Sequence, residues 1–349
     1  MEKVITIEDI AREAGVGKGT VDRVLHNRGR VAAETRDRVL KCIEELGYKP
    51  NTAARMLAKT RIYKIAVIYH DEQKEFWGQI RKGVEKAQEE FAPMGVKVDY
   101  LLLPYIDVQK QLNAIQSAID HKYDGLAIVP YQSPRIVELL NSAIKNGLQV
   151  VTFNSKEKKI NCSYIGQDGY KSGQTAGKLL SMIAEKESNY AVISATNRIM
   201  THVDERNEGF QDSIKRYRKD MKLEGVYTFP EDNEFVYTKV KSLVQEKDID
   251  AIYVTTAMTG TVAKAVNDAD ISKKIFLMGH DLTETNVKYL KKGIIDILIG
   301  QEPERQSYEA VSRICRKLLT DEKIEDDIYT GIHVYVQENI DNNEELNNG

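Results

Sequence analysis

A chain of 349 residues is longer than one typical hydrophobic core supports, which predicts two or three domains. Hydrophobic residues make up 42% of the chain and charged residues 30%, a balance typical of folded globular proteins and not of disordered ones. No apolar run approaches the roughly 18 residues of a membrane-spanning helix, and the 3 cysteines are scattered, which argues against a disulfide framework or a structural metal site.

The overall net charge of −3 conceals an uneven distribution along the chain. Residues 1–61 carry 13 Lys and Arg against 9 Asp and Glu, a net charge of +4. The remaining residues carry 37 basic against 44 acidic side chains, a net charge of −7. Positive charge concentrated in a small N-terminal unit favours contact with a phosphate backbone.

The first 60 or so residues have a helical pattern. Thr6 is placed to cap a helix, with Asp9 three residues on in the position of a capping box. Apolar residues then recur at helical spacing as far as Gly15. A second short helix is predicted from about Lys18 to Leu25, and a third from about Ala33 to Leu46. Two short helices joined by a glycine-containing turn and supported by a longer third indicate a helix-turn-helix unit.

From about Tyr63 onward, short apolar runs alternate with amphipathic helical stretches. The predicted strands are 65–69, 96–103, 126–129, 150–153, 190–194, 251–254, 275–278 and 294–299. The predicted helices are 77–91, 109–121, 135–146, 170–185, 205–218 and 305–319. This alternation predicts an α/β fold of doubly wound parallel sheets, in two lobes because the strands are too many for one sheet. In such sheets ligands bind beyond the carboxyl ends of the strands, where we look for a site.

These patterns divide the chain into four predicted segments. They are a helix-turn-helix domain over residues 1–50, a connecting segment over 51–62, a two-lobed domain over 63–337 and a tail over 338–349. Because the tail is rich in Asn, Glu and Asp, we expect it to be disordered.

Two runs in the N-terminal unit resemble the LacI/GalR repressor family. One extends from Ile5 to Val16 and continues from Thr20 to Leu25, and the other extends from Thr35 through Leu46-Gly47-Tyr48-Lys49-Pro50-Asn51 to Ala58. The match covers essentially all of residues 4–60 at the family's own spacing. From Lys64 to about Val336 the chain resembles the two-lobed, type I periplasmic-binding-protein-like fold that this family carries. The motifs there are looser: 123–130, 150–154, 166–168, 206–210, 278–281 and 301–303.

The resemblance implies which residues meet DNA. By position in the family motif, the second helix presents Lys18, Gly19 and Arg23 to base edges in the major groove. Lys and Arg can donate hydrogen bonds to guanine O6 and N7. Gly19 offers no side chain and so reduces the number of bases that the helix can read directly. The full set expected in the helical unit is Thr6, Lys18, Gly19, Thr20, Arg23, Arg30 and Thr35, the threonines and Arg30 serving phosphates or positioning. The alternative is that Lys18 and Arg23 merely solvate a helix face.

Residues 51–58 resemble the family's hinge helix. Asn51, after Pro50, would cap it, and eight residues are too few to hold a helix alone in water. We therefore expect the segment to order only when it is paired with its twin on DNA. The resemblance places Leu57 as a wedge in the minor groove, with Asn51 and Ala54 beside it. The alternative is a plain linker helix with Leu57 packed internally.

The expected effector site lies after the strands of the two lobes. Aromatic rings stack on the apolar face of a sugar, and charged or amide side chains bond its hydroxyls. The candidate effector-binding residues are Phe76, Trp77, Asn154, Arg206, Thr256, Asp281 and Gln301, of which Asn154 and Thr256 are the weaker. The open alternatives are a core role for Phe76 and Trp77, an interlobe salt bridge for Arg206, a surface position for Gln301 and a structural role for His280.

The family resemblance predicts a small-molecule effector, and two departures from its pattern bear on which one. Asn154 stands where many sugar binders have Asp, and Thr255-Thr256-Ala257 replaces the usual Asn-Asp. A carbohydrate is the first expectation, and a purine or another metabolite the second. We expect ligand to favour a closed arrangement of the lobes and so to alter the spacing of the hinge helices.

The sequence therefore predicts a homodimeric regulator, most simply a repressor, that binds a pseudo-palindromic double-stranded DNA operator. We expect no cofactor, no metal and no membrane partner. The first residues do not have the pattern of a signal peptide, so a cytoplasmic protein is expected. The main alternative is a solute-binding protein for sugars with no role at DNA. An enzyme comes third, because no GxSxG, HExxH or GxGxxG motif occurs.

Overall fold

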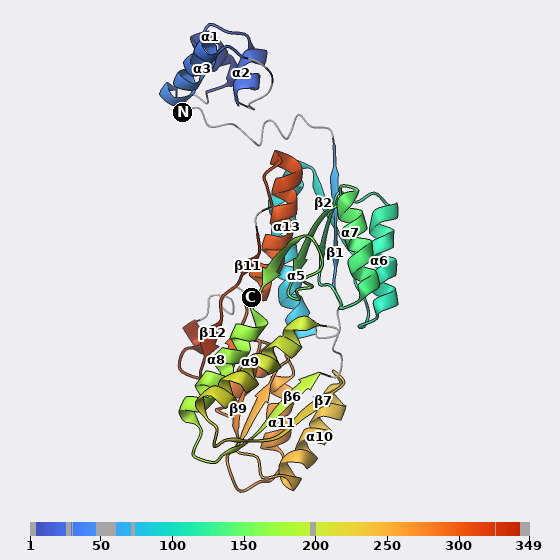
Figure 1. Ribbon diagram of the computed structural model, residues 1–349, viewed down its shortest axis with the longest axis vertical. Coiled ribbons are helices and arrows are strands. Elements are labelled where there is room, and N and C mark those ends of the chain that lie inside the picture. The colour runs from blue at the N-terminus through green and yellow to red at the C-terminus, as the bar shows by residue number, and fades with distance from the viewer. Residues whose placement is uncertain are drawn as a thin grey trace. The chain divides into compact units, whose positions relative to one another are not determined.

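The computed structural model describes residues 5–25, 29, 31–46, 61–70, 74–195, 200–324 and 326–342 (Figure 1). The chain divides into two compact units, Met1–Thr60 and Arg61–Gly349, which we call the head and the body. Among the described residues, no helix is both long and apolar enough to cross a membrane.

The head contains the three predicted helices. They are α1 (Ile7–Glu13), α2 (Lys18–Leu25) and α3 (Ala33–Glu45). The predicted capping box of α1 is present, with the Thr6 side chain accepting from the Asp9 amide and Asp9 accepting in return. Gly15 turns the chain toward α2 with a φ of 64°, a left-handed conformation that favours glycine. Small and branched apolar residues of the three helices form the core of the head: Ile10, Ala11, Ala14, Val21, Val24, Val39 and Cys42.

The body contains two sheets, which define its first and second lobes. The first sheet has the order β11-β5-β4-β3-β1-β2, and the second β12-β10-β9-β8-β6-β7. The strands of the first lobe are β1 (Tyr63–Ile68), β2 (Val96–Tyr100), β3 (Gly125–Ile128), β4 (Gln149–Phe153), β5 (Ser163–Gly166) and β11 (Ile328–Tyr329). Those of the second are β6 (Asn189–Ala195), β7 (Lys222–Phe229), β8 (Ala251–Val254), β9 (Phe276–His280), β10 (Ile297–Gly300) and β12 (His333–Tyr335). β12 runs antiparallel to β10, and the other described pairings are parallel.

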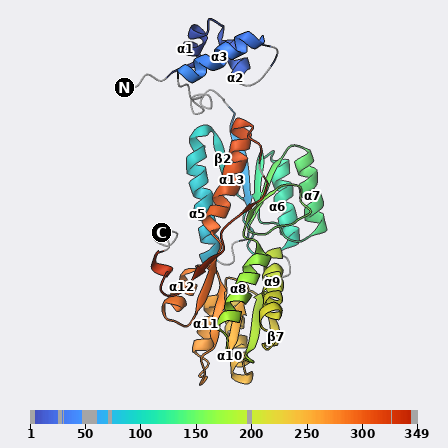
Figure 2. The same cartoon turned by 60° about the vertical axis from the view of Figure 1, so that its left-hand side comes forward.

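Helices cover both faces of each sheet, as the alternating pattern predicts. In the first lobe, α5 (Lys74–Phe91) and α13 (Pro303–Thr320) lie side by side on one face, and α6 (Val108–Asp120) and α7 (Pro134–Lys145) lie on the other (Figure 2). In the second lobe, α8 (Gly169–Ile183) and α9 (Thr201–Tyr217) pack on one face. The opposite face carries α10 (Asn233–Glu246), α11 (Thr259–Asn267) and α12 (Glu284–Lys291). Short 3₁₀ helices occur at Ala92–Met94 and Ile340–Asn342.

The chain passes between the lobes in three segments, 166–168, 300–302 and 330–331. Hydrogen bonds tie these segments together. Thr330 donates its amide to the carbonyl of Gly166 over 2.9 Å and its hydroxyl to the carbonyl of Gln301 over 3.0 Å. The three segments therefore form one bonded hinge between the sheets.

The structure adds elements that the sequence pattern did not predict and shortens the predicted tail. The additional elements are β5, β7, β11, β12, α10, α11 and α12. The expectation of disorder from residue 338 is corrected over 338–342, because the Ile340 side chain is fully buried in the core shared by α10, α11 and α12. Residues 343–349 lie outside the described part of the chain.

Candidate functional site

One face of α2 is exposed and carries the side chains expected at base edges. Lys18, Gly19 and Arg23 are exposed, whereas Val21 and Val24 on the opposite face are buried in the core of the head. The Nε atom of Arg23 donates to the carbonyl of Gly19 over 2.9 Å, which holds the guanidinium along the helix. The ammonium of Lys18 pairs with Glu8 of α1. The exposed side chains of α2 thus include the two cations that the sequence analysis expects at base edges, together with Asp22.

The other predicted DNA contacts have mixed outcomes. Thr20 is half-buried in α2, and Thr35 is half-buried in the first turn of α3. The Thr6 hydroxyl is engaged in the capping box, where it also donates to Asp9 over 2.7 Å. The remaining predicted contacts lie outside the described residues: Arg30, Asn51, Ala54 and Leu57.

In the body, three of the predicted effector residues form a chain of hydrogen bonds between the lobes. Asn154 follows β4 in the first lobe, Asp281 follows β9 in the second, and Gln301 lies in the hinge after β10. Gln301 donates from Nε2 to Asp281 over 2.6 Å, and Asn154 donates from Nδ2 to Gln301 Oε1 over 3.4 Å. All three side chains are buried. The surface position considered for Gln301 is therefore wrong.

The backbone at these strand ends explains the residue types there. Asn154 has a φ of 61° and Asp281 a φ of 72°, both in the left-handed region. Apart from glycine, Asn and Asp enter this region most readily, because their short side chains bond locally. A β-branched residue at either position would strain the turn that follows the strand.

Arg206 is the largest of the fully buried side chains, with an exposed fraction of 1%. Its Nη1 atom donates to the carbonyl of Thr255 over 3.0 Å, and its Nη2 atom to Oε1 of Gln167 over 3.3 Å. These partners belong to the second lobe and the hinge, so the guanidinium is not held by an interlobe salt bridge. Its Nε atom is buried with no hydrogen-bond partner among the described residues. Buried donors are normally bonded, so this one is available to a polar ligand.

Gln167 is a functional candidate that the sequence reasoning missed. Besides accepting from Arg206, its Nε2 atom donates to the carbonyls of Gly300 over 2.9 Å and Gly331 over 3.1 Å. One amide therefore joins all three hinge segments and connects them to Arg206. Gln167 is the middle residue of the motif 166–168, which the sequence analysis includes, but nothing in a lone glutamine signals contacts this distant along the chain.

Phe76 and Trp77 lie in the first turn of α5 and belong to an aromatic cluster. Trp77 stacks on Tyr69 with ring centroids 5.3 Å apart and meets His70 at 4.5 Å and Phe76 at 5.0 Å, both edge to face. Tyr131, which follows β3, lies 6.0 Å from His70. Both predicted residues are 6% exposed or less, so they are part of the core as well as candidates for stacking.

Three histidines of the body, all extensively buried, share a preference for the neutral form. Burial lowers the pKa of His70 to about 3. Burial also lowers the pKa of His202 and His280, and the charge of Arg206 adds to the effect at both. The Nδ1 atom of each ring is buried and has no hydrogen-bond partner among the described residues. The sequence reasoning overlooked His70 and His202, although His70 directly follows the apolar run of β1.

The carboxyl group of Asp281 and the guanidinium of Arg206 supply the opposite charges of the site. Burial raises the pKa of Asp281, and Arg206 and the hydrogen bond from Gln301 act in the opposite direction. Among the described residues, no group of three or more His, Cys, Asp or Glu is placed to hold a metal ion.

His280 and Thr256 complete the second-lobe side of the site. His280 lies 2.7 Å from the Tyr253 hydroxyl through its Nε2 atom, which favours the structural role considered for it. The Thr256 hydroxyl accepts from the Met258 amide over 3.4 Å, at the turn that follows β8. The Thr256 side chain is 6% exposed.

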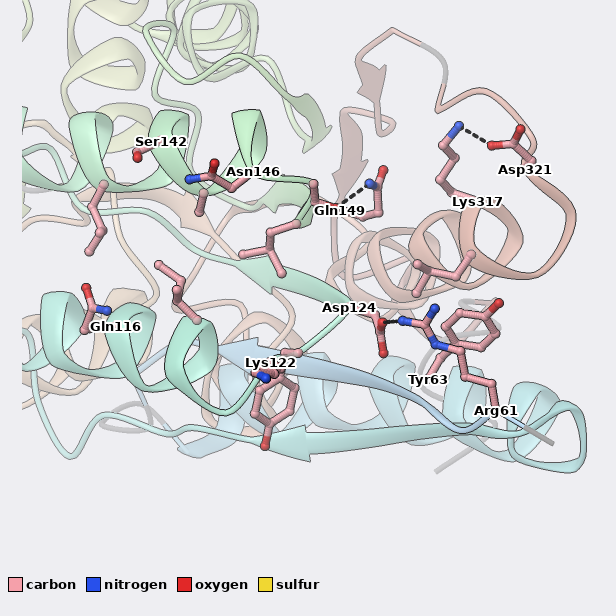
Figure 3. Close-up of a pocket in the computed structure, with 17 residues that line it drawn as sticks. Arg61, Tyr63, Gln116, Lys122, Asp124, Ser142, Asn146, Gln149, Lys317 and Asp321 are labelled. Carbon is pink, nitrogen blue, oxygen red and sulfur yellow. Dashed lines mark hydrogen bonds and ion pairs between the residues drawn. The ribbon is translucent and has the colours of Figure 1, made fainter. Parts of the chain in front are cut away.

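A separate cavity of about 780 Å³ lies at the opposite edge of the first sheet, where its strands begin (Figure 3). Figure 3 shows the Arg61–Asp124 and Lys317–Asp321 pairs beside it, with Gln116 and Asn146 on the neighbouring helices. None of the predicted effector residues lines this cavity. Ligands of parallel sheets bind at the carboxyl ends of the strands, which lie at the other end of the sheet from this cavity.

Two family models match the chain. Residues 6–51 match the model of bacterial regulatory proteins of the lacI family, and residues 65–322 match the periplasmic binding protein domain. The two matches fall in the head and in the body, respectively.

A similar regulator matches nearly the whole chain, and a solved structure matches the body. The chain is 24% identical over 345 residues to the HTH-type transcriptional regulator pepR1 of Lactobacillus delbrueckii, covering 92% of this chain and 93% of that one. It is 24% identical over 211 residues to the regulator IdnR of Escherichia coli, spanning 60% of each chain. The body has the fold of an ABC-transporter solute-binding protein from Burkholderia graminis solved in complex with D-arabinose. That match has a TM-score of 0.74 and 21% identity, and covers 81% of this chain and 98% of that one.

Proposed function

The chain belongs to the lacI family of bacterial regulatory proteins, and from this premise we propose that it is a transcription regulator, most simply a repressor, whose affinity for a specific DNA operator is controlled by a small molecule. The observation that carries the proposal is the presence of two modules in one chain. The head matches a DNA-binding family over residues 6–51, and the body matches a ligand-binding family over residues 65–322.

DNA recognition is assigned to the exposed face of α2. Lys18 and Arg23 are five residues apart in α2, are both exposed, and carry the hydrogen-bond donors that guanine O6 and N7 accept. Gly19 is proposed to lie at base edges beside them, and Thr6, Thr20, Arg30 and Thr35 are proposed to fix the register on the duplex, chiefly at phosphates. Asn51, Ala54 and Leu57 are proposed to reach the minor groove from the hinge segment.

The proposed effector is a carbohydrate or a similar neutral polyol. The buried Arg206, Asp281 and Gln301 offer donors and acceptors for several hydroxyl groups. The aromatic cluster around Trp77 offers ring faces for the apolar face of a sugar. The structurally similar solute-binding protein from Burkholderia graminis was solved with D-arabinose, which supports a carbohydrate. A purine or another metabolite is the second candidate.

The proposed mechanism links closure of the lobes to DNA. Ligand bound at residues of both lobes and the hinge stabilises the closed arrangement, because only that arrangement brings all of the ligand's partners together. In a homodimer, closure changes the separation of the two hinge segments and therefore of the two recognition helices. We place this function in the cytoplasm, where DNA is accessible, and propose no catalytic step for the body.

Selection of duplexes from a randomised pool tests the DNA-binding part of the proposal. The full-length chain should enrich an inverted repeat whose half-sites are about one helical turn apart. Thermal-shift screening of sugars and nucleobases tests the effector part, and a neutral sugar should raise the melting temperature. Enrichment of no sequence, or stabilisation by nucleobases alone, would refute the corresponding part.

A further inference from the structure

Two residues of α5 reach from the first lobe to the second. Glu75 accepts a hydrogen bond from the backbone amide of Thr285 over 3.0 Å and another from its hydroxyl over 2.7 Å. Gln79, one turn further along α5, donates from Nε2 to the carbonyl of Leu282 over 3.1 Å. Residues four apart lie on the same face of a helix. One face of α5 is therefore bonded to the start of α12 and the loop before it.

The position of Thr285 within α12 makes the contact with Glu75 informative. Thr285 is the second residue of α12 after the N-cap Thr283. The first amides of a helix lack a partner within the helix, and its N-terminus attracts a carboxylate. The following amide, that of Asn286, is bonded to the Thr283 hydroxyl over 3.2 Å inside the second lobe. Of these two adjacent amides, one is bonded across the lobes and the other within a single lobe.

A second set of bonds joins the lobes elsewhere. Thr201, at the start of α9, donates its hydroxyl to the carbonyl of Lys156 over 2.8 Å and lies 3.2 Å from the hydroxyl of Ser155. α5 follows β1 and Ser155 follows β4, whereas α12 follows β9 and α9 follows β6. In the first sheet β3 lies between β1 and β4, and in the second sheet β8 lies between β9 and β6. The two lobes are thus bonded to each other at two separate places by contacts that involve none of the predicted effector residues.

We propose that Glu75 is a positioning residue for effector binding, whose carboxylate latches α12 when the lobes close and so raises the closed fraction of the free protein. The side chains of both lobes that form the effector site then face each other before ligand arrives. A protein that already populates its binding-competent form binds ligand with less loss of apparent affinity. This last consequence rests on the proposed function, whereas the latch itself does not.

Hydrogen exchange of the Thr285 amide tests the latch in the full-length protein without DNA or effector. In the wild-type protein this amide should be protected, although it has no partner within α12. Glu75→Gln keeps the shape of the side chain and removes its charge, so exchange at Thr285 should rise roughly three- to tenfold while Asn286 is unchanged. Glu89→Gln is the matched control, because Glu89 is an exposed glutamate about four turns further along the same helix and should have no effect.

Three results would overturn the proposal. The first is that the wild-type Thr285 amide exchanges as fast as an unprotected amide. The second is that Glu75→Gln leaves its exchange unchanged, and the third is that Glu75→Gln accelerates exchange at Thr285 and Asn286 equally. The last result would mean that the end of α12 frays and that the lobes do not separate. Since neither DNA nor ligand is present, failure of the latch leaves the proposed regulatory function standing, and failure of that function leaves the latch standing.

Discussion

The guanidinium of Arg206 donates to the side-chain oxygen of Gln167 over 3.3 Å. The nitrogen of the same Gln167 amide donates to two other segments of the hinge, at Gly300 and Gly331. The largest buried cation of the body is therefore connected through one side chain to every crossing between the lobes. If Arg206 binds the effector as proposed, the ligand is therefore connected through Gln167 to all three hinge segments.

Arg206→Lys should weaken effector binding by roughly 10- to 100-fold, because lysine cannot reproduce the planar fork of donors that arginine presents to Thr255, Gln167 and a ligand. Calorimetric titration with the sugar identified by screening measures the change. Arg216→Lys, an exposed position on the same helix, is the control and should bind as the wild type does. Equal affinities for the two variants would remove Arg206 from the site.

Asp281→Asn should make the protein more stable and less able to bind its effector. Burial raises the pKa of Asp281, so the folded state carries a penalty for ionising it. The penalty is fully present above the raised pKa and disappears as the pH falls to the unfolded value of about 3.8. Asparagine tolerates the left-handed φ of 72° at this position and retains an acceptor for Gln301.

Thermal melting of the Asp281→Asn variant between pH 7 and pH 4 measures this effect. The gain in melting temperature over wild type should be largest at neutral pH and should shrink toward acidic pH. A loss of stability at pH 7, or a gain that does not depend on pH, would show that the buried carboxylate carries no such penalty.

His70→Phe should flatten the acid side of the stability profile. The pKa of His70 is about 3 in the folded protein and 6.5 for an unperturbed histidine, as in the unfolded chain. Between these pH values the unfolded chain therefore binds a proton that the folded chain does not. Stability therefore falls as the pH drops from 6.5 toward 3, by about 1.4 kcal/mol per pH unit for one proton. Phenylalanine keeps a ring against Trp77, at the 4.5 Å contact, and has no proton to bind.

Unfolding by denaturant at several pH values checks the His70 prediction. In His70→Phe the slope of the unfolding free energy against pH should decrease by up to about 1.4 kcal/mol per pH unit, the amount that corresponds to one bound proton. His202 and His280 contribute in the same direction, so some slope should remain. A variant whose slope matches that of the wild type would show that His70 takes up its proton without unfolding.

Arg23→Ala should weaken binding to the selected operator by about 1–3 kcal/mol and should relax the preference at one base position, because a guanidinium that reads guanine is lost. Competition binding against operators substituted at each position measures both effects. Lys41→Ala removes a cation of the same charge from α3, where it pairs with Glu45 at 3.7 Å, and should leave the base preference intact. Uniform weakening across all sequences would assign Arg23 to the phosphates instead.

Thr6→Ala should destabilise α1 by about 1 kcal/mol, because the capping box loses its hydroxyl and the Asp9 amide loses its acceptor. Amide exchange in α1 of the full-length chain reports this change. Thr6→Ser retains the hydroxyl and should exchange as the wild type does. Slow exchange in both variants would indicate that the tertiary packing of Ile10 and Ala11, and not the cap, holds the helix.

Much of the fold could be predicted from the sequence because the controlling signals are local. The Thr6–Asp9 box, the apolar spacing of the head and the apolar runs of the buried strands each specify an element within a few residues. The missed elements lack such signals. β7 is an edge strand with no buried residue and no long apolar run, and β11 has two residues whose pairing with β5 depends on the fold.

The candidate site was predictable only in part for the same reason. Asp281 and Asn154 were recognisable as polar residues at strand ends, which is where ligands of parallel sheets bind. Gln167, His70 and Glu75 owe their roles to partners that lie far away in the chain, such as Glu75 to Thr285, 210 residues on. Sequence spacing carries no information about contacts of that kind.

The most direct measurement is the affinity of the full-length protein for the selected inverted repeat and for a scrambled duplex of equal length at physiological salt. A regulator of the proposed kind should prefer the inverted repeat by at least about 10³-fold, and the effector should change that ratio. Equal affinity for the two duplexes, with or without effector, would contradict the proposal that the head reads sequence under the control of the body.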